Sequence, residues 1–559
     1  MRQVLKGSRV TVALALVLAL ATSLAPATQA FAHVDRDRRP SAKPLVKLQL
    51  LAINDFHGAL ESRTLNKRPI GGAAVLAAYL NQREASATAL GEQTLRLGGG
   101  DLIGASPPVS ALLGDVPTIQ ALDMMDFDYS VVGNHEFDKG LTNLRYLQNG
   151  PTRTGRDSGH KRSREATFTG ADFKYLAANV VNDKTGKPVF PPYAVRTIKG
   201  VKVGIIGVIA EDTPSVVMPS SVAGLKFLDE AATVNKYVAK LRKSGVRTFI
   251  VLMHQGGAGT LTGGPLTGDV VPVVTAMDED VDVVISAHSH AGYQGLIGNK
   301  LVTQAFANST GLADIDMTLD PKSGDCTTKT AEIVSPYGDV APGTTPDARI
   351  ALFVAEMKAL VAPIIGQVVG TASAPVLKTA SAGGDSPAGD FIADAQRWQM
   401  GTQVALMNAG GVRSDIATAA GPVLWGQLFT AQPFSNYLMK MDLTGAQIKT
   451  ALEQQWLGQT YARILQPSGI SYSWSAAAPV GSRVVTDSVL IGGAPMSPTT
   501  TYSVTVNNFI AAGGDNFSVL KSGTNLVVGP TDIDALVAYV KSLPQPFGAP
   551  ASGRITQLP

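Results

Sequence analysis

The sequence predicts an α/β protein of two or three domains, and three observations support this. The chain has 559 residues, which is more than one ordinary domain holds. Short apolar runs alternate with amphipathic stretches, a pattern typical of buried strands packed against helices. The composition is that of a globular chain with many turns, because 45% of residues are hydrophobic, 16% are charged, and there are 57 Gly and 33 Pro.

The N-terminus predicts an export signal. Three basic residues within the first nine precede an apolar stretch at 10–20, and Ala30-Phe31-Ala32 offers the small residues that a signal peptidase requires. We therefore expect residues 1–32 to be removed before His33. The apolar stretch is shorter than the ~20 residues that span a bilayer, and no later stretch is long enough. The sequence thus predicts a secreted or cell-envelope protein without a stable membrane anchor.

The charge balance and the cysteine content narrow the possible functions. Residues 1–32 hold three basic residues and no acidic one, so the rest of the chain has 44 basic and 44 acidic residues. Proteins that track long nucleic acid usually carry a basic surplus, so we expect a small-molecule substrate. Nothing in the sequence predicts a protein partner. Cys326 is the one cysteine, so a thiolate metal site is excluded and any metal must have oxygen and imidazole ligands.

Predicted strands of the first domain each end in a turn with polar side chains. The strands are expected at Val46–Ile53, 94–97, 129–132, Val201–Ile209, 248–253 and 281–285. Helical spacing of apolar residues predicts helices at 73–84 and 231–243. Sites of α/β sheets usually lie at the carboxyl ends of the strands, so we expect function there.

A change of composition predicts where the second domain begins. Residues 336–346 are rich in Pro, Gly and Thr, and 347–365 has apolar residues at helical spacing. A helix-like stretch at 391–398 and strand-like stretches at 403–407 and 502–507 then indicate more α/β structure. We therefore predict a signal peptide at 1–32, a first domain at 45–335, a linker with a connecting helix at 336–365, and a second domain at 366–550.

Five of the seven histidines stand at predicted strand ends. His33 lies in the leader, and His160 lies in a polar, Gly-rich segment at 150–169 that we interpret as a surface insertion. The other five lie beside Gly, Asp, Asn or small residues, which scattered core histidines would not all do. They are His57, His135, His254, His288 and His290.

These histidines belong to motifs that are weak singly and strong together. Asp55-x-His57 and His288-x-His290 each offer two ligands, Asp101 follows three glycines, and Gly133-Asn134-His135-Glu136-x-Asp138 combines an amide, a histidine and a carboxylate. Taken alone, His254 is more typical of a structural histidine than of a ligand. The combined ligand set is Asp55, His57, Asp101, Asn134, His254, His288 and His290.

Seven such ligands suit two cations that share one bridging carboxylate and keep positions open for water and substrate. Oxygen and imidazole donors favour zinc or manganese, with cobalt or iron as further candidates, over calcium. Paired cations are a standard arrangement for phosphoester hydrolysis. The sequence therefore predicts a dimetal phosphoesterase.

The order of these motifs resembles the calcineurin-like metallophosphoesterase superfamily. Asn54-Asp55-Phe56-His57-Gly58 and Gly133-Asn134-His135-Glu136-Phe137-Asp138 resemble its exported 5′-nucleotidase family. The resemblance covers nearly the whole mature chain. It implies an α/β fold in which an N-terminal metallophosphoesterase αββα sandwich is joined by a helical linker to a C-terminal α/β substrate-binding domain, with the site at the domain interface.

The resemblance also implies a role for each residue of the metal motifs. Asp55, His57 and His290 would hold one cation, Asn134, His254 and His288 the other, and Asp101 would bridge them. His135 would not be a ligand. Together with Asp138 it would act in catalysis, since a protonated imidazole stabilises a developing anion or assists a leaving group.

The second domain carries further motifs of this family. Asn408-Ala409-Gly410-Gly411-Val412-Arg413 resembles its Asn-x-Gly-x-x-Arg loop, while Pro433-Phe434, Asn508-Phe509 and the segment around Asp515 resemble its base-binding segments. Taken alone, both phenylalanines would be interpreted as core residues. The implied substrate-binding residues are Lys378, Asn408, Arg413, Phe434, Phe509 and Asp515.

The sequence departs from the family pattern at Lys378, where an arginine is common. Lysine keeps the positive charge of arginine but cannot form two parallel hydrogen bonds to phosphate, which implies weaker phosphate binding or a different substrate.

The leading predicted function is hydrolysis of nucleoside 5′-monophosphates, and also of di- or triphosphates, outside the cell. The alternatives are a 2′,3′-cyclic-nucleotide 2′-phosphodiesterase with 3′-nucleotidase activity, a nucleotide-sugar hydrolase, and a nonenzymatic nucleotide-binding surface protein.

Overall fold

Two six-stranded sheets form the N-terminal part of the fold in the computed structural model, which describes residues 44–151, 168–551 and 553–559. The strand order in the first sheet is β16 (Cys326–Val334), β15 (Leu312–Leu319), β1 (Val46–Ile53), β4 (Gln93–Gly98), β5 (Tyr129–Val131) and β6 (Lys174–Leu176). The order in the second is β13 (Gly292–Ile297), β14 (Lys300–Ala305), β12 (Val281–Ser286), β11 (Thr248–His254), β9 (Val201–Ile209) and β8 (Tyr193–Ile198). Neighbours from β1 to β6 pair in parallel, as do those from β9 to β14.

The central strands β1 and β11, one in each sheet, are buried on both faces, which explains their continuous apolar runs. In β1, Leu50 belongs to the core between the two sheets, whereas its neighbour Leu51 packs against the outer helices. In β11, Leu252 belongs to the same inner core and Met253 to the outer one. The two-residue period of a strand thus supplies two cores from one sequence.

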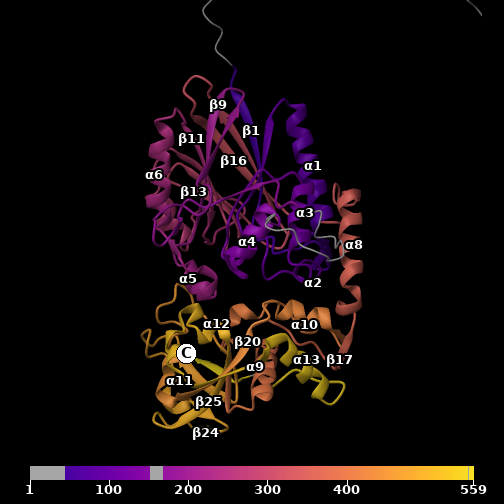
Figure 1. The fold of residues 1–559 in the computed structure, drawn as a ribbon, viewed down its shortest axis with the longest axis vertical. Coiled ribbons are helices and arrows are strands. Elements are labelled where there is room, and N and C mark those ends of the chain that lie inside the picture. Colours follow the sequence, from indigo (N-terminus) through magenta and orange to yellow (C-terminus); the bar gives the residue numbers. More distant parts are fainter. Residues whose placement is uncertain (1–43, 152–167, 552) are drawn as a thin grey trace, which may run out of the picture. The chain divides into compact units, whose positions relative to one another are not determined.

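Helices cover the outer face of each sheet (Figure 1). On the first sheet these are α1 (Ala73–Ala89), α3 (Val116–Met124), α4 (Gly140–Asn149) and α8 (Ala348–Ile365). On the second sheet they are α6 (Glu230–Arg242) and α7 (Val270–Ala276). The layer order is helix, sheet, sheet, helix, so the predicted αββα sandwich is confirmed.

Short elements complete this part of the chain. Two small antiparallel pairs are β2 (Arg63–Leu65) with β3 (Arg68–Ile70), and β7 (Val180–Asn182) with β10 (Leu225–Phe227). The short helices are α2 (Pro108–Ala111), α5 (Thr213–Val216) and the 3₁₀ helices η1 (His135–Phe137) and η3 (Pro219–Val222).

The C-terminal part contains three sheets. The five-stranded sheet has the order β21 (Gln466–Ser468), β18 (Val404–Met407), β25 (Thr501–Asn507), β20 (Tyr437–Thr444) and β26 (Thr524–Thr531). A four-stranded sheet has the order β24 (Ala494–Pro495), β23 (Leu490–Ile491), β22 (Ile470–Ser475) and β27 (Ile555–Leu558), and β17 (Val368–Ala372) pairs with β19 (Gly421–Leu424). The helices are α9 (Pro387–Met400), α10 (Trp425–Ala431), α11 (Gly445–Glu453), α12 (Asn508–Ala511) and α13 (Asp532–Ser542).

Two apolar clusters stabilise the C-terminal part. One contains α11 and residues of the five-stranded sheet such as Leu406 and Val504. The other joins α9, α10 and α13, with Phe391 and Leu536 among its buried members. This is the second α/β body that the sequence predicts.

Most predicted elements are observed, and the differences have simple causes. The helix expected at 73–84 continues to Ala89, and the connecting helix expected at 347–365 is α8. β16 was not predicted, because its side chains are mostly exposed or half-buried and it contains no apolar run. The leader and most of the 150–169 segment, including His33 and His160, lie outside the described residues.

Residues Pro44–Pro559 form one compact unit, so the domain boundaries expected near residues 335 and 365 remain a prediction.

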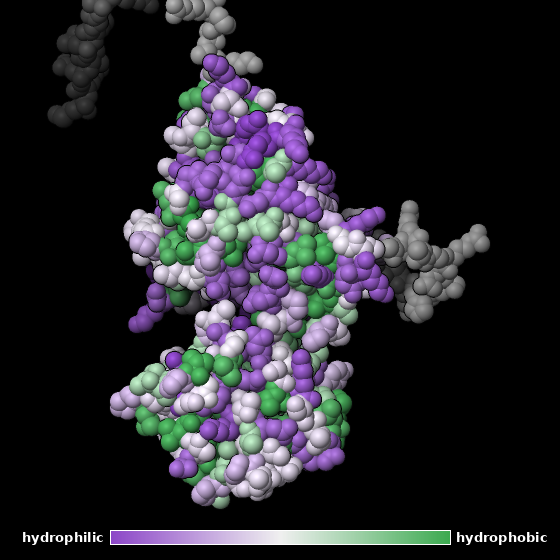
Figure 2. Space-filling view, turned by 90° about the vertical axis from the view of Figure 1, so that its left-hand side faces the viewer, coloured by the Kyte–Doolittle hydropathy of each residue, from purple (hydrophilic) through white to green (hydrophobic). Residues whose placement is uncertain are grey.

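On the face shown in Figure 2, hydrophilic residues are interspersed with smaller groups of hydrophobic ones. Among the described residues, none of the helices has the length and apolar character needed to cross a membrane.

Candidate metal centre

The seven predicted ligands come from the carboxyl ends of parallel strands in both sheets. Asp55 and His57 follow β1, Asp101 follows β4, and Asn134 follows β5. In the second sheet the ligands come from the ends of β11 and β12. His254 is the last residue of β11, and His288 and His290 follow β12. Because parallel strands end at one edge, residues far apart in the sequence meet there.

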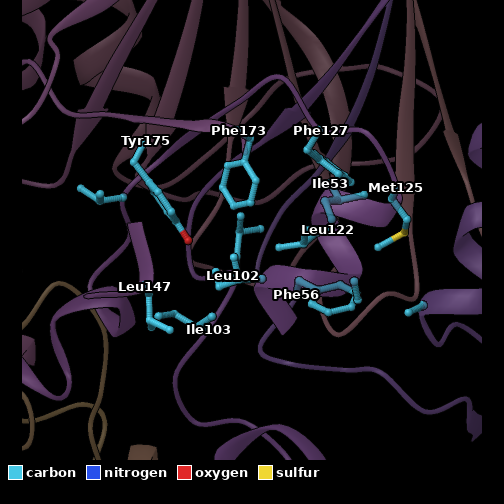
Figure 3. Packing of buried hydrophobic residues seen from close by; sticks show 14 of the residues in the cluster. Ile53, Phe56, Leu102, Ile103, Leu122, Met125, Phe127, Leu147, Phe173 and Tyr175 are labelled. Atoms are coloured by element: carbon cyan, nitrogen blue, oxygen red, sulfur yellow. The ribbon is translucent and has the colours of Figure 1, made fainter. Parts of the chain in front are cut away.

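Apolar neighbours anchor the loops that carry these ligands. Phe56, between Asp55 and His57, is fully buried, and Leu102 and Ile103 directly follow Asp101. Figure 3 shows all three in one packed cluster beneath the first sheet. The close packing of protein interiors then limits how far the adjacent polar side chains can move.

Five of the seven predicted ligands have left-handed backbone conformations, which non-glycine residues rarely adopt. Strain of this kind costs roughly 1–3 kcal/mol per residue and concentrates at functional sites. A structural role alone would not need so many strained positions in one place. The residues and their φ angles are Asp55 (48°), His57 (47°), Asp101 (48°), His288 (73°) and His290 (58°).

The donor atoms converge on two adjacent positions. Those of Asp55, His57 and His290 lie within 4.8 Å of one another, as do those of Asp101, His254 and His288. Asp101 also belongs to a group with His57 and His135, so its carboxylate lies between the two positions.

Asn134 completes the second position. Its Oδ1 lies 3.1 Å from His254 Nε2 and 3.0 Å from His288 Nδ1. On the other side of that position, His254 Nε2 is 3.1 Å from Asp101 Oδ2. Buried oxygen and imidazole donors meeting in this way fit two divalent cations that share Asp101.

Backbone carbonyls orient two of the histidine rings. His57 Nδ1 lies 2.9 Å from the carbonyl of Gly104, and His254 Nδ1 lies 2.9 Å from that of Gly99. A ring that donates its Nδ1–H to a carbonyl presents the Nε2 lone pair to a cation, which is the usual outer support of a metal-binding histidine.

Electrostatics favour neutral rings at two ligand positions. Burial and the positive charge of His254 lower the pKa of His288 to about 3, and burial and the positive charge of Arg413 lower the pKa of His290 to about 3. Burial opposes a charge on His254 as well, but the Asp101 carboxylate outweighs it and raises the pKa of His254 to about 9. A cation at this position must therefore displace a proton from His254.

Glu136 ties the Asp101 and Asn134 loops together, a role that the sequence did not reveal. Its buried carboxylate accepts the backbone N–H groups of Asp101 and Leu102, both at 2.9 Å, and of Gly133 at 2.6 Å. Its position directly after His135 was the available signal, but only the fold shows which N–H groups it reaches.

His135 pairs with Asp138 beside the cluster. Its Nδ1 lies 2.9 Å from Asp138 Oδ2, and its backbone N–H donates to Asp101 Oδ1 at 2.8 Å. Burial disfavours the imidazolium, but the carboxylates of Asp138 and Asp101 outweigh burial and raise the pKa of His135. The protonated form can donate a proton, so the role expected for His135 from the sequence stays a prediction.

A pocket of about 620 Å³ joins this cluster to residues of the C-terminal part. His135 stacks on Phe434, with ring centroids 5.7 Å apart and an angle of 17° between the planes. The Arg413 guanidinium lies 5.8 Å from the centroid of the Phe434 ring. The predicted residues that line the pocket are Asp101, Asn134, His135, Asp138, His288, His290, Asn408, Arg413, Phe434, Phe509 and Asp515.

Of the predicted substrate-binding residues, Lys378 lies outside the pocket lining, whereas Asn408 belongs to it. Lys378 is exposed and does not line the pocket. It is nevertheless close enough to Arg413 for the positive charge of Arg413 to contribute to lowering the pKa of Lys378. Asn408 is buried, donates to Asp515 Oδ2 at 2.9 Å and accepts from Asn507 at 2.8 Å. Asn408 therefore positions Asp515.

Several further residues line the pocket but belong to no motif, so they were not predicted from the sequence. They are Asp212, Asp269, Asn436, Thr460, Tyr461 and Arg463.

Comparison with known proteins identifies the family. Residues 48–292 match the family model of calcineurin-like phosphoesterases, and residues 368–522 match that of the 5′-nucleotidase C-terminal domain. The cell wall protein Lmo0130 of Listeria monocytogenes is 34% identical over 90% of this chain and 68% of that protein. This chain belongs to the 5′-nucleotidase family of calcineurin-like phosphoesterases. It is accordingly a metal-dependent phosphoester hydrolase with a divalent dimetal centre, and the nonenzymatic alternative is not supported.

Two further comparisons show how far the similarity extends. Endonuclease YhcR of Bacillus subtilis is 33% identical over 95% of this chain, which spans 42% of that protein's length. The crystal structure of a 5′-nucleotidase precursor from Thermus thermophilus has 28% identity and a TM-score of 0.74, covering 92% of this chain and 99% of the other. The 5′-nucleotidase fold therefore extends over nearly the whole chain.

Proposed function

We propose that this chain hydrolyses nucleoside 5′-monophosphates to nucleoside and phosphate with two divalent cations, zinc or manganese, with cobalt or iron as further candidates. One observation carries the proposal: the converging donor groups open, through Asp101, Asn134, His288 and His290, into a pocket that aromatic and cationic residues of the C-terminal part also line. Nucleoside di- and triphosphates are further substrates under this proposal. The balanced charge supports a small nucleotide rather than long nucleic acid.

The proposed roles follow the two groups of donors. Asp55, His57 and His290 hold one cation; Asn134, His254 and His288 hold the other; Asp101 contacts both. When bound, such cations activate water and neutralise charge on the transferring phosphoryl group.

His135 is the proposed proton donor. Asp138 binds its Nδ1–H, which fixes the tautomer and leaves Nε2 directed away from that carboxylate. In this role Nε2–H stabilises charge on the phosphoryl oxygens or protonates the leaving oxygen of the nucleoside.

The C-terminal residues are proposed to bind the rest of the nucleotide. Arg413 pairs with the phosphate, and Lys378 adds positive charge nearby. Phe434 and Phe509 provide aromatic surfaces for the base, and stacking is worth roughly 1–3 kcal/mol per base in single-strand binders. Asp515 accepts hydrogen bonds from ribose hydroxyls, and Asn408 holds it in place.

A parallel assay on AMP and on 2′,3′-cyclic AMP tests the proposed substrate. We expect phosphate release from AMP, loss of activity after chelation, and recovery on adding zinc or manganese. Preferential hydrolysis of the cyclic ester would instead identify a 2′,3′-cyclic-nucleotide phosphodiesterase and contradict the proposal. No observation at present favours that alternative.

We further propose that the protein acts outside the cytoplasm. The signal-like residues 1–32 and the similarity to a cell wall protein support this. N-terminal sequencing of protein from the medium or envelope should begin at His33. Recovery of the full-length chain from the cytoplasm alone would contradict export.

A further inference from the structure

Arg463 occupies the pocket wall beside the proposed nucleoside subsite, and no motif assigns it a role. It lies between α11 and β21, and its backbone N–H donates to the carbonyl of Gln455 at 2.8 Å. Its side chain is 12% exposed, and its guanidinium lies 4.7 Å from the centroid of the Tyr461 ring. Both residues line the pocket that also contains Phe509.

One amino group of the Arg463 guanidinium already forms an ion pair within the protein. Arg463 Nη1 donates to Asp515 Oδ1, while Asn408 donates to the other carboxylate oxygen of Asp515. This ion pair fixes the plane of the guanidinium against Asp515. A fixed, planar arginine loses less conformational entropy when it binds a second partner.

The remaining edge has a donor without a partner. Arg463 Nε is buried and has no hydrogen-bond partner within the described part of the chain. In arginine, Nε–H and Nη2–H lie on one side and form a fork, as Arg68 demonstrates by binding both oxygens of Asp339 at 2.9 and 2.7 Å. A buried donor that stays unpaired is costly, so a ligand acceptor is expected at this fork.

The surrounding charges favour a neutral acceptor over an anion. Asp212 and Asp269 line the same pocket. Burial raises the pKa of Asp212, Arg463 opposes that rise, and Asp269 adds to it, so the three groups influence one another. Two nearby carboxylates would repel a second phosphate but not the edge of a base.

We propose that Arg463 is a specificity-determining residue that reads the base, with its Nε/Nη2 fork donating to O6 and N7 of a 6-oxopurine. Guanine and hypoxanthine offer two adjacent acceptors at this edge, whereas adenine replaces O6 by an amino donor. This inference rests on the proposed nucleotide substrate and adds a preference for GMP and IMP over AMP. Pairing of this kind discriminates between bases by roughly 5- to 150-fold.

Arg463→Lys is the decisive variant, because lysine can keep the ion pair with Asp515 but cannot form the fork. For the wild type we expect kcat/KM on GMP and IMP to exceed that on AMP by at least about 5-fold. In the variant the ratio should fall to about one, mainly through the loss on GMP and IMP. Activity on p-nitrophenyl phosphate, which has no base, should be unchanged and reports on folding and on the metal centre.

Arg196→Lys is the matched control, since Arg196 is 44% exposed on β8 and pairs with Asp128 away from the pocket. It should retain the wild-type base preference. A wild-type ratio near one, or an undiminished ratio in Arg463→Lys, would overturn the inference. If the variant instead loses activity on ADP relative to AMP with the base ratio intact, the fork binds phosphate and the base assignment is wrong.

The base preference and the proposed ester can fail separately. If 5′-monophosphates are not hydrolysed, the proposed function fails. The same comparison made with 2′,3′-cyclic GMP and 2′,3′-cyclic AMP then still measures the base preference. Loss of that preference in Arg463→Lys would support the inference, and its retention would overturn it.

Discussion

Replacing His135 by alanine is expected to lower kcat on AMP by roughly 10²- to 10⁴-fold, the usual contribution of a general acid. The reason is geometric, because Asp138 holds Nδ1 at 2.9 Å while the ring lies beside Asp101 and His57. Since His135 is proposed not to be a ligand, the variant should bind as many cations as the wild type. Steady-state kinetics combined with elemental analysis of the purified protein measures both properties.

Asp138→Asn is the companion variant to His135→Ala. It keeps the imidazole but removes the carboxylate that raises the pKa of His135, so an intermediate loss of kcat is expected. Because the carboxylate favours the protonated ring, the activity of Asp138→Asn should decline at a lower pH than that of the wild type. Full activity in His135→Ala, or loss of cations from it, would contradict the assigned role.

Asp101→Asn should have the largest effect of any single substitution in the metal centre. Asp101 is buried, lies 3.1 Å from His254 Nε2 and 3.9 Å from His57 Nε2, and accepts the N–H of His135. Asparagine keeps the size but removes the charge that two cations would share. We expect fewer than two bound cations per chain and a loss of kcat of roughly 10³-fold or more, since metal ions contribute several kcal/mol to such reactions.

Asp316→Asn is a suitable control for the Asp101 variant. Asp316 lies on β15 in the same sheet, but its side chain is exposed and belongs to neither group of donors. The control should retain both cations and wild-type activity. An Asp101→Asn protein with two tightly bound cations and normal kcat would show that the carboxylate does not bridge.

The candidate metal centre could be predicted from the sequence because its predicted ligands stand in short sequence motifs. Each ligand stands in a short motif after an apolar run, and parallel strands bring their ends to one edge of a sheet. Asp55, for example, needed only the preceding strand and the following histidine to be noticed. The left-handed backbone at Asp101 was less visible, although the three glycines before it marked a tight turn.

The pocket wall could not be predicted to the same extent, because its contacts join distant segments without a motif. Arg463 lies in a loop of no distinctive pattern, and its partner Asp515 is 52 residues away. Asn408 lines the pocket, but no motif shows that its side chain is also paired with Asp515 and Asn507. Only the folded chain shows which polar atoms are already paired.

We propose that two cations, held by the seven donors, carry out the hydrolysis. The most direct test is to titrate zinc or manganese into chelator-treated protein while measuring bound metal and AMP hydrolysis in the same samples. We predict that activity rises in step with occupancy and saturates at two cations per chain. Full activity with one cation or none, or two bound cations without any phosphoester hydrolysis, would contradict the claim.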